Sequence, residues 1–185
     1  MADLIRYAAQ LEDAASGSLP PVDKWNPEIS GEIDLVIKRD GTWMHEGAPI
    51  KRAPLVRLFS TVLKREGQKY FLVTPVEKLE IRVEDAPFVA VLMKQDSQGP
   101  DQNLTFTTNV GDTIGAGRDH RLEFRTDMNT GESAPYLHVR MGLDARIARA
   151  VFYDLVDLCE TRTIGGEKHF GVYSGGEFFF TRTGG

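Results

Sequence analysis

The pattern of hydrophobic and polar positions predicts a chain of short β-strands interrupted by few helices. Apolar residues alternate with polar ones over 33–37, 77–85 and 104–110, which is the period of a strand with one face in water. The segment 88–96 is more continuously apolar, so we expect a strand buried on both faces. Further strands are predicted at 68–75, in a weak form within 111–120, and in a closing hairpin whose turn is Gly175-Gly176.

Three segments have helical periodicity. Residues 3–15 place Leu4, Ala8, Leu11 and Ala15 on one face of a short amphipathic helix. Residues 53–67 form a second helix, with Pro54 in its first turn and Gly67 as its stop. A third helix is expected at 143–160 with Asp144 as its N-cap. The proline-containing segment 16–30 is expected to be an ordered leader, because Trp25 is too large and apolar to lie free in water.

The order of elements is written twice. Residues 33–63 read as strand, turn, strand and helix, with Asp40-Gly41 as a two-residue hairpin turn, and residues 122–158 repeat that order. We therefore expect an α+β fold of two related modules, with domains at 1–84 and 85–185. Two unrelated hairpin–helix units remain an alternative. Related modules that pack together leave a crevice, and clefts between domains are favoured ligand sites.

Composition narrows the class of protein. The net charge is −5 and the pI is near 5.4, which argues against broad binding of nucleic acid. One cysteine, Cys159, excludes an intrachain disulfide and suits a reducing compartment. No apolar run approaches the ~20 residues of a membrane span, and the start resembles no secretory signal. We expect a soluble cytoplasmic protein.

The common catalytic and cofactor motifs are absent from the sequence. The segment "GVYSGG" misses the spacing of a serine-hydrolase turn, so Ser174 is expected to serve a turn. No phosphate-binding loop occurs, and the Gly-rich segment 111–117 opens no helix. The four histidines form no His-x-x-x-His pair, and Cys159 is interpreted as a core residue. No cofactor or metal is expected.

Basic residues gather where the second predicted helix begins. Lys51, Arg52 and Arg57 lie near its N-terminus, where free N–H groups and the helix dipole already favour anions. His138 and Arg140 hold the corresponding place in the second module. The alternative is a solvated basic face, or ion pairs with the acidic segment 77–85.

Several long segments resemble a known family. They are "WNP" (25–27) and the stretches 31–67, 70–88, 104–112 and 136–158. Together they are similar to the uncharacterised bacterial domain-of-unknown-function family 1285, over nearly the whole chain after residue 20. The resemblance implies a duplicated α+β core whose second domain is loosely pleckstrin-homology-like. It also implies a site for a nucleotide-like molecule at the domain junction and a role in signal transduction, but no activity.

These observations favour a non-catalytic regulatory protein that binds a small anionic, nucleotide-like ligand between its domains. The candidate stacking surfaces are Trp25 and Trp43, and the candidate anion contacts are Arg52, Lys78, His138 and Arg140. One alternative is a hydrolase or transferase acting on a phosphorylated small molecule, with His45 or His138 as base, helped by Asp85 or Asp112. Another is a protein-interaction module that uses its sheet edges, in signalling.

Overall fold

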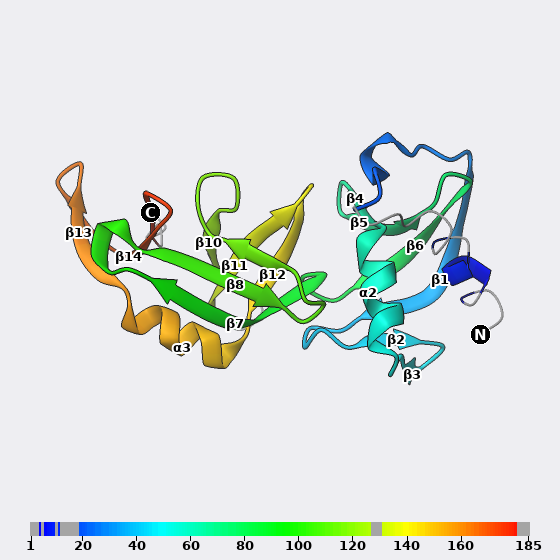
Figure 1. Ribbon diagram of the computed structural model, residues 1–185, viewed down its shortest axis with the longest axis horizontal. Helices are drawn as coiled ribbons and strands as arrows, with labels where there is room; N and C mark the ends of the chain where they lie inside the picture. The colour runs from blue at the N-terminus through cyan, green and yellow to red at the C-terminus, as the bar shows by residue number, and fades with distance from the viewer. Residues whose placement is uncertain (1–3, 5, 10, 12–18, 127–130, 181–185) are drawn as a thin grey trace. The chain divides into compact units, whose positions relative to one another are not determined.

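The computed structural model describes residues 4, 6–9, 11, 19–126 and 131–180, and the chain divides into two compact units (Figure 1). The first unit spans Met1–Ala86 and the second Pro87–Gly185. Each contains a six-stranded sheet, and the second also has a three-stranded sheet. The protein is therefore mostly β with few helices, which is compatible with an α+β class.

The sheet of the first unit has the order β3-β2-β1-β6-β5-β4, with β1 and β6 parallel and the other neighbours antiparallel. The helix α2 lies against one face of this sheet (Figure 1). The elements are β1 (Ile29–Ile37), β2 (Trp43–His45), β3 (Ala48–Pro49), α2 (Ala53–Thr61), β4 (Leu63–Glu66), β5 (Lys69–Val73) and β6 (Glu77–Val83).

The core of the first unit lies between the sheet and α2. The Trp43 ring stacks on Phe59 of α2, with centroids 6.3 Å apart and planes inclined by 23°. Tyr7 packs on the same phenylalanine at 6.4 Å. In the predicted N-terminal helix, residues 4, 6–9 and 11 are helical and the predicted apolar face is buried, whereas Ala15 lies outside the described residues.

The leader packs against this unit, as expected. It contains a short 3₁₀ helix, Val22–Lys24, whose Val22 side chain is completely buried. The ammonium of Lys64 donates to the Trp25 carbonyl at 3.0 Å and ties the leader to β4.

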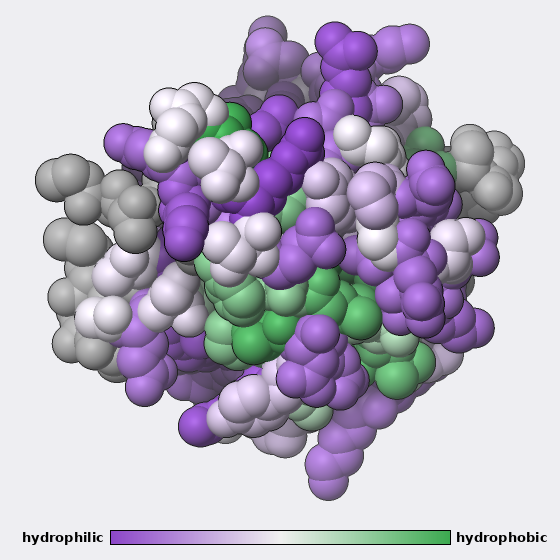
Figure 2. All heavy atoms as spheres, turned by 90° about the vertical axis from the view of Figure 1, so that its left-hand side faces the viewer, coloured by the Kyte–Doolittle hydropathy of each residue, from purple (hydrophilic) through white to green (hydrophobic). Residues whose placement is uncertain are grey.

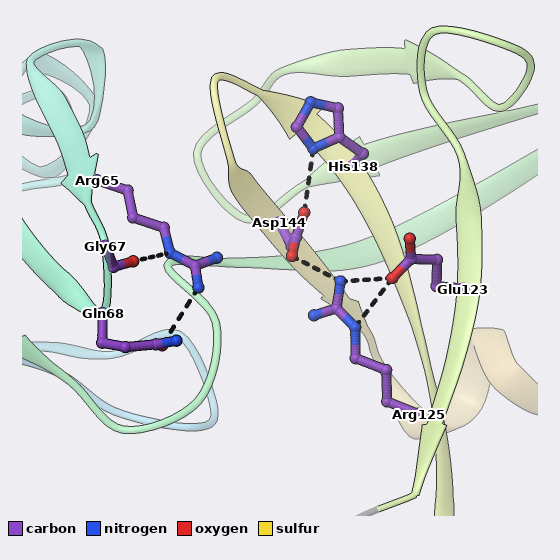
Figure 3. Close-up of polar contacts among 7 residues, drawn as sticks. All are labelled: Arg65, Gly67, Gln68, Glu123, Arg125, His138 and Asp144. Carbon is purple, nitrogen blue, oxygen red and sulfur yellow. Dashed lines mark hydrogen bonds and ion pairs between the residues drawn. The ribbon is translucent and has the colours of Figure 1, made fainter.

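The second predicted helix is shorter than expected. Pro54 does lie in its first turn, but the helix ends at Thr61, and residues 63–66 form β4, which pairs with β5. Residues 64–66 carry only polar side chains and extend no apolar helical face, whereas pairing satisfies their backbone groups. Gly67, predicted as a helix stop, begins the two-residue turn to β5 with φ of 61°. Arg65 closes over this turn, donating to the Gly67 carbonyl at 2.9 Å (Figure 3).

The Asp40-Gly41 hairpin turn also differs from the prediction. Gly41 N–H donates to the Lys38 carbonyl at 2.9 Å, and Lys38 N–H donates to the Thr42 carbonyl at 2.8 Å. Only Gly41 of this pair has a positive φ, of 89°, so the loop has three residues, 39–41, and a two-residue turn with two positive φ angles is wrong. The Asp40 carboxylate accepts from Thr42 N–H at 2.9 Å, which stabilises this longer loop.

The six-stranded sheet of the second unit has the order β10-β11-β12-β7-β8-β9, and the small sheet has the order β13-β14-β15. The helix α3 lies along β7 (Figure 1). The elements are β7 (Phe88–Asp96), a 3₁₀ helix (Gly99–Asp101), β8 (Asn103–Thr108), β9 (Thr113–Gly115), β10 (Leu122–Thr126), β11 (Ser133–Arg140), β12 (Leu143–Ile147), α3 (Arg149–Asp157), β13 (Glu160–Ile164), β14 (Glu167–Ser174) and β15 (Glu177–Phe180).

Buried polar contacts join the two sheets of the second unit. The Ser174 hydroxyl donates to the Ala116 carbonyl at 2.7 Å and accepts from Leu104 N–H at 2.9 Å. The Gln102 amide donates to the Tyr173 carbonyl at 2.7 Å. These side chains provide hydrogen-bond partners for the Ala116 and Tyr173 carbonyls and the Leu104 N–H group, which lie where the two sheets meet. The predicted closing hairpin is confirmed, with Ser174 paired to Glu177 across Gly175-Gly176.

The third predicted helix is partly wrong. Leu143–Ile147 is the strand β12, which pairs with β11 and, in parallel, with β7, so Asp144 is not an N-cap. The helix begins only at Arg149, after Ala148. Leu143, Ala145 and Ile147 alternate as a buried strand face, a pattern that also fits part of a helix. The strand β13 was missed because all its residues are exposed and show no alternation.

The strand β7 is buried over only part of its length. Phe88, Val89 and Ala90 are buried, but Val91 and Leu92 are 42% and 59% exposed, so the prediction of burial on both faces is wrong there. The parallel partner β12 ends opposite Ala90, where a bulge also begins, and no described strand pairs with the rest of β7 on that side. The predicted turn before β11 falls partly on residues 127–130, outside the described residues.

Candidate functional site

A polar cluster lies on one face of β10, β11 and β12 in the second unit. Across the ladders Glu123 lies opposite Tyr136, and His138 lies opposite Asp144, so these side chains share the face away from buried Leu137. Arg125 donates to Glu123 at 2.8 Å and to Asp144 at 2.8 Å (Figure 3). The guanidinium of Arg125 also lies 4.6 Å from the ring centroid of Tyr136.

His138 and Asp144 form a histidine–carboxylate pair of the kind that can take part in proton transfer. His138 Nδ1 lies 3.1 Å from the Asp144 carboxylate. The side chain of Asp144 is 10% exposed, whereas that of His138 is 35% exposed. When Nδ1 carries the proton toward the carboxylate, Nε2 is a proton acceptor, the arrangement used by a general base. Sequence reasoning paired His138 with Asp85 or Asp112, but its partner is Asp144.

The charges of this cluster compensate one another. Partial burial lowers the pKa of Arg125, but its hydrogen bonds to Glu123 and Asp144 outweigh that effect and raise the pKa above its ordinary value. Asp144 accepts from both Arg125 and His138, so the buried carboxylate is well satisfied. The charged groups of the cluster are therefore paired with one another, and the cluster offers little net positive potential to attract an added anion.

Arg140, the other predicted anion contact in this unit, is engaged within the fold. It donates to the Asp112 carboxylate at 2.9 Å, and its guanidinium lies 5.0 Å from the ring centroid of Phe88. Its side chain is 14% exposed. Arg140 therefore joins the end of β11 to the loop before β9, and a ligand anion would compete with Asp112.

Lys78 and Trp25, two of the predicted site residues of the first unit, are linked through Glu66 and Lys64. Lys78 donates to Glu66 at 2.8 Å, and Lys64 lies 3.4 Å from the other oxygen of the same carboxylate while holding the Trp25 carbonyl. The hydrogen bond from Lys78 is the main cause that lowers the pKa of Glu66 below its ordinary value. The Lys78 ammonium also lies 4.8 Å from the ring centroid of Phe71, so this lysine is not a free cation.

The two predicted stacking surfaces differ. Trp25 is half-buried and lies in the leader directly after the 3₁₀ helix Val22–Lys24. Trp43 is 1% exposed and stacks on Phe59 in the core, so it offers no face to a ligand and its assignment as a stacking surface is corrected. Trp43 follows a hairpin turn on a strand whose inner face packs on α2, and a large apolar ring on that face is buried by packing.

The basic residues at the start of α2 have no ionic partner in the part of the chain that the structure describes. Lys51, Arg52 and Arg57 are exposed, and none forms an ion pair or side-chain hydrogen bond with the described residues. Ion pairs of these residues with segment 77–85 are therefore not formed in the described chain. Arg52 stands immediately before α2, with extended backbone.

A hollow of about 650 Å³ on the first sheet was not predicted. Val36 and Met44 line it, and charged residues surround them in three ion pairs: Lys38–Glu84 at 2.6 Å, Lys69–Glu80 at 2.7 Å and Arg82–Asp34 at 3.0 Å. Charged residues at alternate positions, Asp34 and Lys38 in the first stretch and Glu80, Arg82 and Glu84 in the second, mark the wet face of β1 and β6. The sequence alone does not show which strands are neighbours. Its charges are matched, so it has no preference for an anion.

Other candidate chemistry is not supported. Partial burial raises the pKa of Cys159 to about 11, which argues against a reactive thiol, but the side chain is half-buried and not the core residue predicted from the sequence. Ser174 is completely buried and bonded on both sides. His45 pairs only loosely with Glu46, at 3.9 Å, and Asp85 pairs with Arg39 at 3.4 Å. The described residues hold no cluster of metal ligands, and none of their helices is long and apolar enough to cross a membrane.

Family models match most of both units. An N-terminal domain of unknown function (DUF1285) matches residues 20–86, and the C-terminal domain of the same protein of unknown function (DUF1285) matches residues 87–180. The chain belongs to the DUF1285 family. The resemblance predicted from the sequence is thereby confirmed.

Two crystal structures of DUF1285 family proteins are similar to this chain. One, from Silicibacter pomeroyi DSS-3, is 49% identical in sequence and superposes with a TM-score of 0.87. The match covers 96% of this chain and 93% of the Silicibacter chain. The other, from Shewanella baltica OS155, is 28% identical in sequence and has a TM-score of 0.53. The match covers 66% of this chain and 90% of the Shewanella chain. Comparison with curated proteins finds no match. DUF1285 membership brings a fold but no activity.

Proposed function

We propose that this DUF1285 protein is a cytoplasmic, non-catalytic regulatory protein in signal transduction, and that it binds a small anionic, nucleotide-like ligand. The observation that carries the proposal is the cationic group at the start of α2, Lys51, Arg52 and Arg57, which forms no ion pair with any described residue. Lys78 and Arg140, which were also predicted as anion contacts, are each engaged by a carboxylate.

The start of α2 is suited to an anion for two reasons. The first turn of a helix leaves N–H groups without intrahelical partners, and its dipole favours negative charge. Exposed guanidinium and ammonium groups add full charges and bidentate donors for a phosphate or carboxylate. The described chain provides no acidic partner there that a ligand must displace.

A thermal-shift screen against nucleotides and phosphorylated metabolites tests this proposal. A ligand at about 100 times its Kd should stabilise the protein by ~2.7 kcal/mol. Arg52→Ala should weaken that response about tenfold or more, because charge-assisted hydrogen bonds are strong. Arg118→Ala, which also removes an exposed arginine, should leave the response unchanged. A flat response across the panel contradicts the proposal.

The proposal extends to the fold: the units are duplicated modules and the second is pleckstrin-homology-like. In each unit a hairpin precedes a nine-residue helix: β1–β2, followed by the short strand β3, comes before α2, and β11–β12 comes directly before α3. Each six-stranded sheet also contains one parallel pair, β1 with β6 and β12 with β7. Superposition of the two hairpin–helix segments in a crystal structure tests this; differing helix directions would contradict a duplication.

The His138–Asp144 pair favours a second candidate, a hydrolase or transferase acting on a phosphorylated small molecule. His138 would be the general base, and Asp144 would orient it. Turnover of a phosphorylated substrate that falls ~10²-fold or more in His138→Gln would establish this candidate. Absence of turnover across the same panel used for binding would eliminate it.

Exposed apolar residues favour a third candidate, a protein-interaction module. Figure 2 shows hydrophobic residues gathered in the middle of one face of the molecule and surrounded by hydrophilic ones. In the second unit the large exposed apolar side chains include Val91, Leu92, Tyr153 and Phe170. A partner that binds the wild type but not Leu92→Glu would support this candidate, and equal binding of both would exclude this surface.

A further inference from the structure

A hollow of about 400 Å³ lies along the seam between β10 and β15 in the second unit. Both strands are outermost in their sheets, and no ladder joins them in the described chain. The hollow is lined from one side by residues 121–124 and from the other by residues 178–180. A volume of this size is within the range of small-molecule sites.

The wall contributed by β15 is aromatic and held in place. The rings of Phe178 and Phe180 lie 5.9 Å apart with planes inclined by 28°. Tyr173 supports Phe178 at 4.8 Å, and His169 supports Phe180 at 4.4 Å. Leu122 and Phe179, which also line the hollow, are buried, so the seam has an apolar base. Rings that are already packed lose little conformational freedom when a flat ligand binds.

Gly171 makes room for this wall. It lies opposite Phe180 in the β14–β15 ladder. A Cβ atom at this position would lie 2.7 Å from the Cβ of Phe180 and 2.2 Å from the Phe179 carbonyl oxygen. The close approach of the two strands at the aromatic wall therefore requires glycine.

One positive charge in the lining, that of Arg121, has no ion-pair partner among the described residues. The side chains of Arg121 and Glu123 stand on the β10 side. Glu123 is bonded to Arg125 at 2.8 Å, but the exposed guanidinium of Arg121 forms no ion pair or hydrogen bond with any described residue. A ligand that carries one negative charge beside a flat ring would satisfy Arg121 and the aromatic wall together.

We infer that this seam is a binding site for a planar aromatic carboxylate. The ring stacks on Phe178 and Phe180, and the carboxylate accepts two hydrogen bonds from Arg121. A monoanion fits better than a phosphate dianion, because Arg121 is the one cation of the lining and the carboxylate Glu123 belongs to the same lining. The guanidinium of Arg162 lies 5.7 Å from the Phe178 ring centroid but outside the lining. This site shares no residue with the anion site proposed at α2, so each can fail without the other.

Isothermal titration calorimetry of the full chain with three probes tests the inference. Indole-3-carboxylate has the ring and the charge, indole-3-carboxamide has the ring alone, and acetate has the charge alone. We expect the first probe to bind at least about tenfold more tightly than the second, because a charged hydrogen-bonded pair is lost. We expect no measurable binding of acetate.

Substitutions in the full chain locate the site. Arg121→Ala should weaken binding of indole-3-carboxylate about tenfold or more, and Phe178→Leu should weaken it roughly two- to tenfold by removing a stacking face. The matched controls are Arg118→Ala, an exposed arginine outside the lining, and Phe152→Leu, a half-buried ring on α3. Both controls, and Arg52→Ala, should bind as the wild type does.

Three results would overturn the inference. They are no heat with indole-3-carboxylate up to millimolar concentration, equal affinity for the carboxamide, and binding that survives both Arg121→Ala and Phe178→Leu. A circular dichroism spectrum and melting temperature for each variant separate loss of binding from loss of folding. If Phe178→Leu fails to fold, Arg121→Ala alone decides, because its exposed side chain has no partner in the described chain.

Discussion

Gly171→Ala should destabilise the second unit by about 2 kcal/mol, because a single methyl group enters a space already occupied. The new Cβ would lie 2.2 Å from the Phe179 carbonyl oxygen and 2.7 Å from the Cβ of Phe180. Neither neighbour is the flexible end of a side chain, and β14 is the central strand of its sheet, so relief requires both ladders to shift. Overpacking of this kind costs about 1–3 kcal/mol.

Urea unfolding followed by far-ultraviolet circular dichroism measures this loss. With an m value of about 2 kcal/mol per M, a loss of about 2 kcal/mol lowers the midpoint by ~1 M. Gly115→Ala is the matched control, since an added Cβ there meets no atom within 4 Å and its φ is not positive. That variant should stay within about 0.5 kcal/mol of the wild type.

Equal stability of Gly171→Ala and Gly115→Ala would refute the reasoning. It would mean that β14 and β15 do not approach at Phe180 as described. The aromatic wall of the seam would then lose its structural basis, because the position of Phe180 depends on the same close approach.

Three further predictions concern titratable groups. Asp144→Asn should cost about 1–3 kcal/mol in urea unfolding because it weakens a buried, doubly bonded acceptor, whereas exposed Glu123→Gln should cost below ~0.5 kcal/mol. Glu66 has a lowered pKa when folded, so its pairing stabilises the protein above the ordinary value of 4.5 and is lost as pH falls below it; Lys78→Met should lose less stability over that acid range than the wild type. Cys159, with a pKa of about 11, should react slowly with iodoacetamide at pH 7 and rapidly in urea, and fast labelling of the folded protein would contradict its burial.

Local patterns predicted most strands and the start of α2 but not the ends of the helices. Pro54 and the apolar spacing after it identified α2. Residues 64–66, which were predicted as part of that helix, belong instead to β4, which pairs with β5. Leu143–Ile147 has a spacing that suits a strand and a helix equally. The segment forms a strand because β11 and β7 lie on its two sides, so that its backbone groups form hydrogen bonds along both edges.

The candidate site shows the same division. Arg52 at a helix start was predictable, because helix starts have a local signature in prolines and apolar spacing. The pairing of His138 with Asp144 was not, since it depends on the register of β11 against β12. The burial of Trp43 depends on α2 covering its strand. The seam beside Phe178 depends on β10 (Leu122–Thr126) and β15 (Glu177–Phe180), two strands that are far apart in the sequence.

The sequence by itself determined the family, the mainly alternating strands, the acidic net charge and the residue types available for binding. These properties belong to single residues or to short stretches, whose periodicity and propensity act locally. The tertiary structure alone decided which cations are neutralised, which aromatic rings are buried and where hollows lie. Those outcomes depend on which distant strands become neighbours, and a shift of one residue in register turns every side chain to the opposite face.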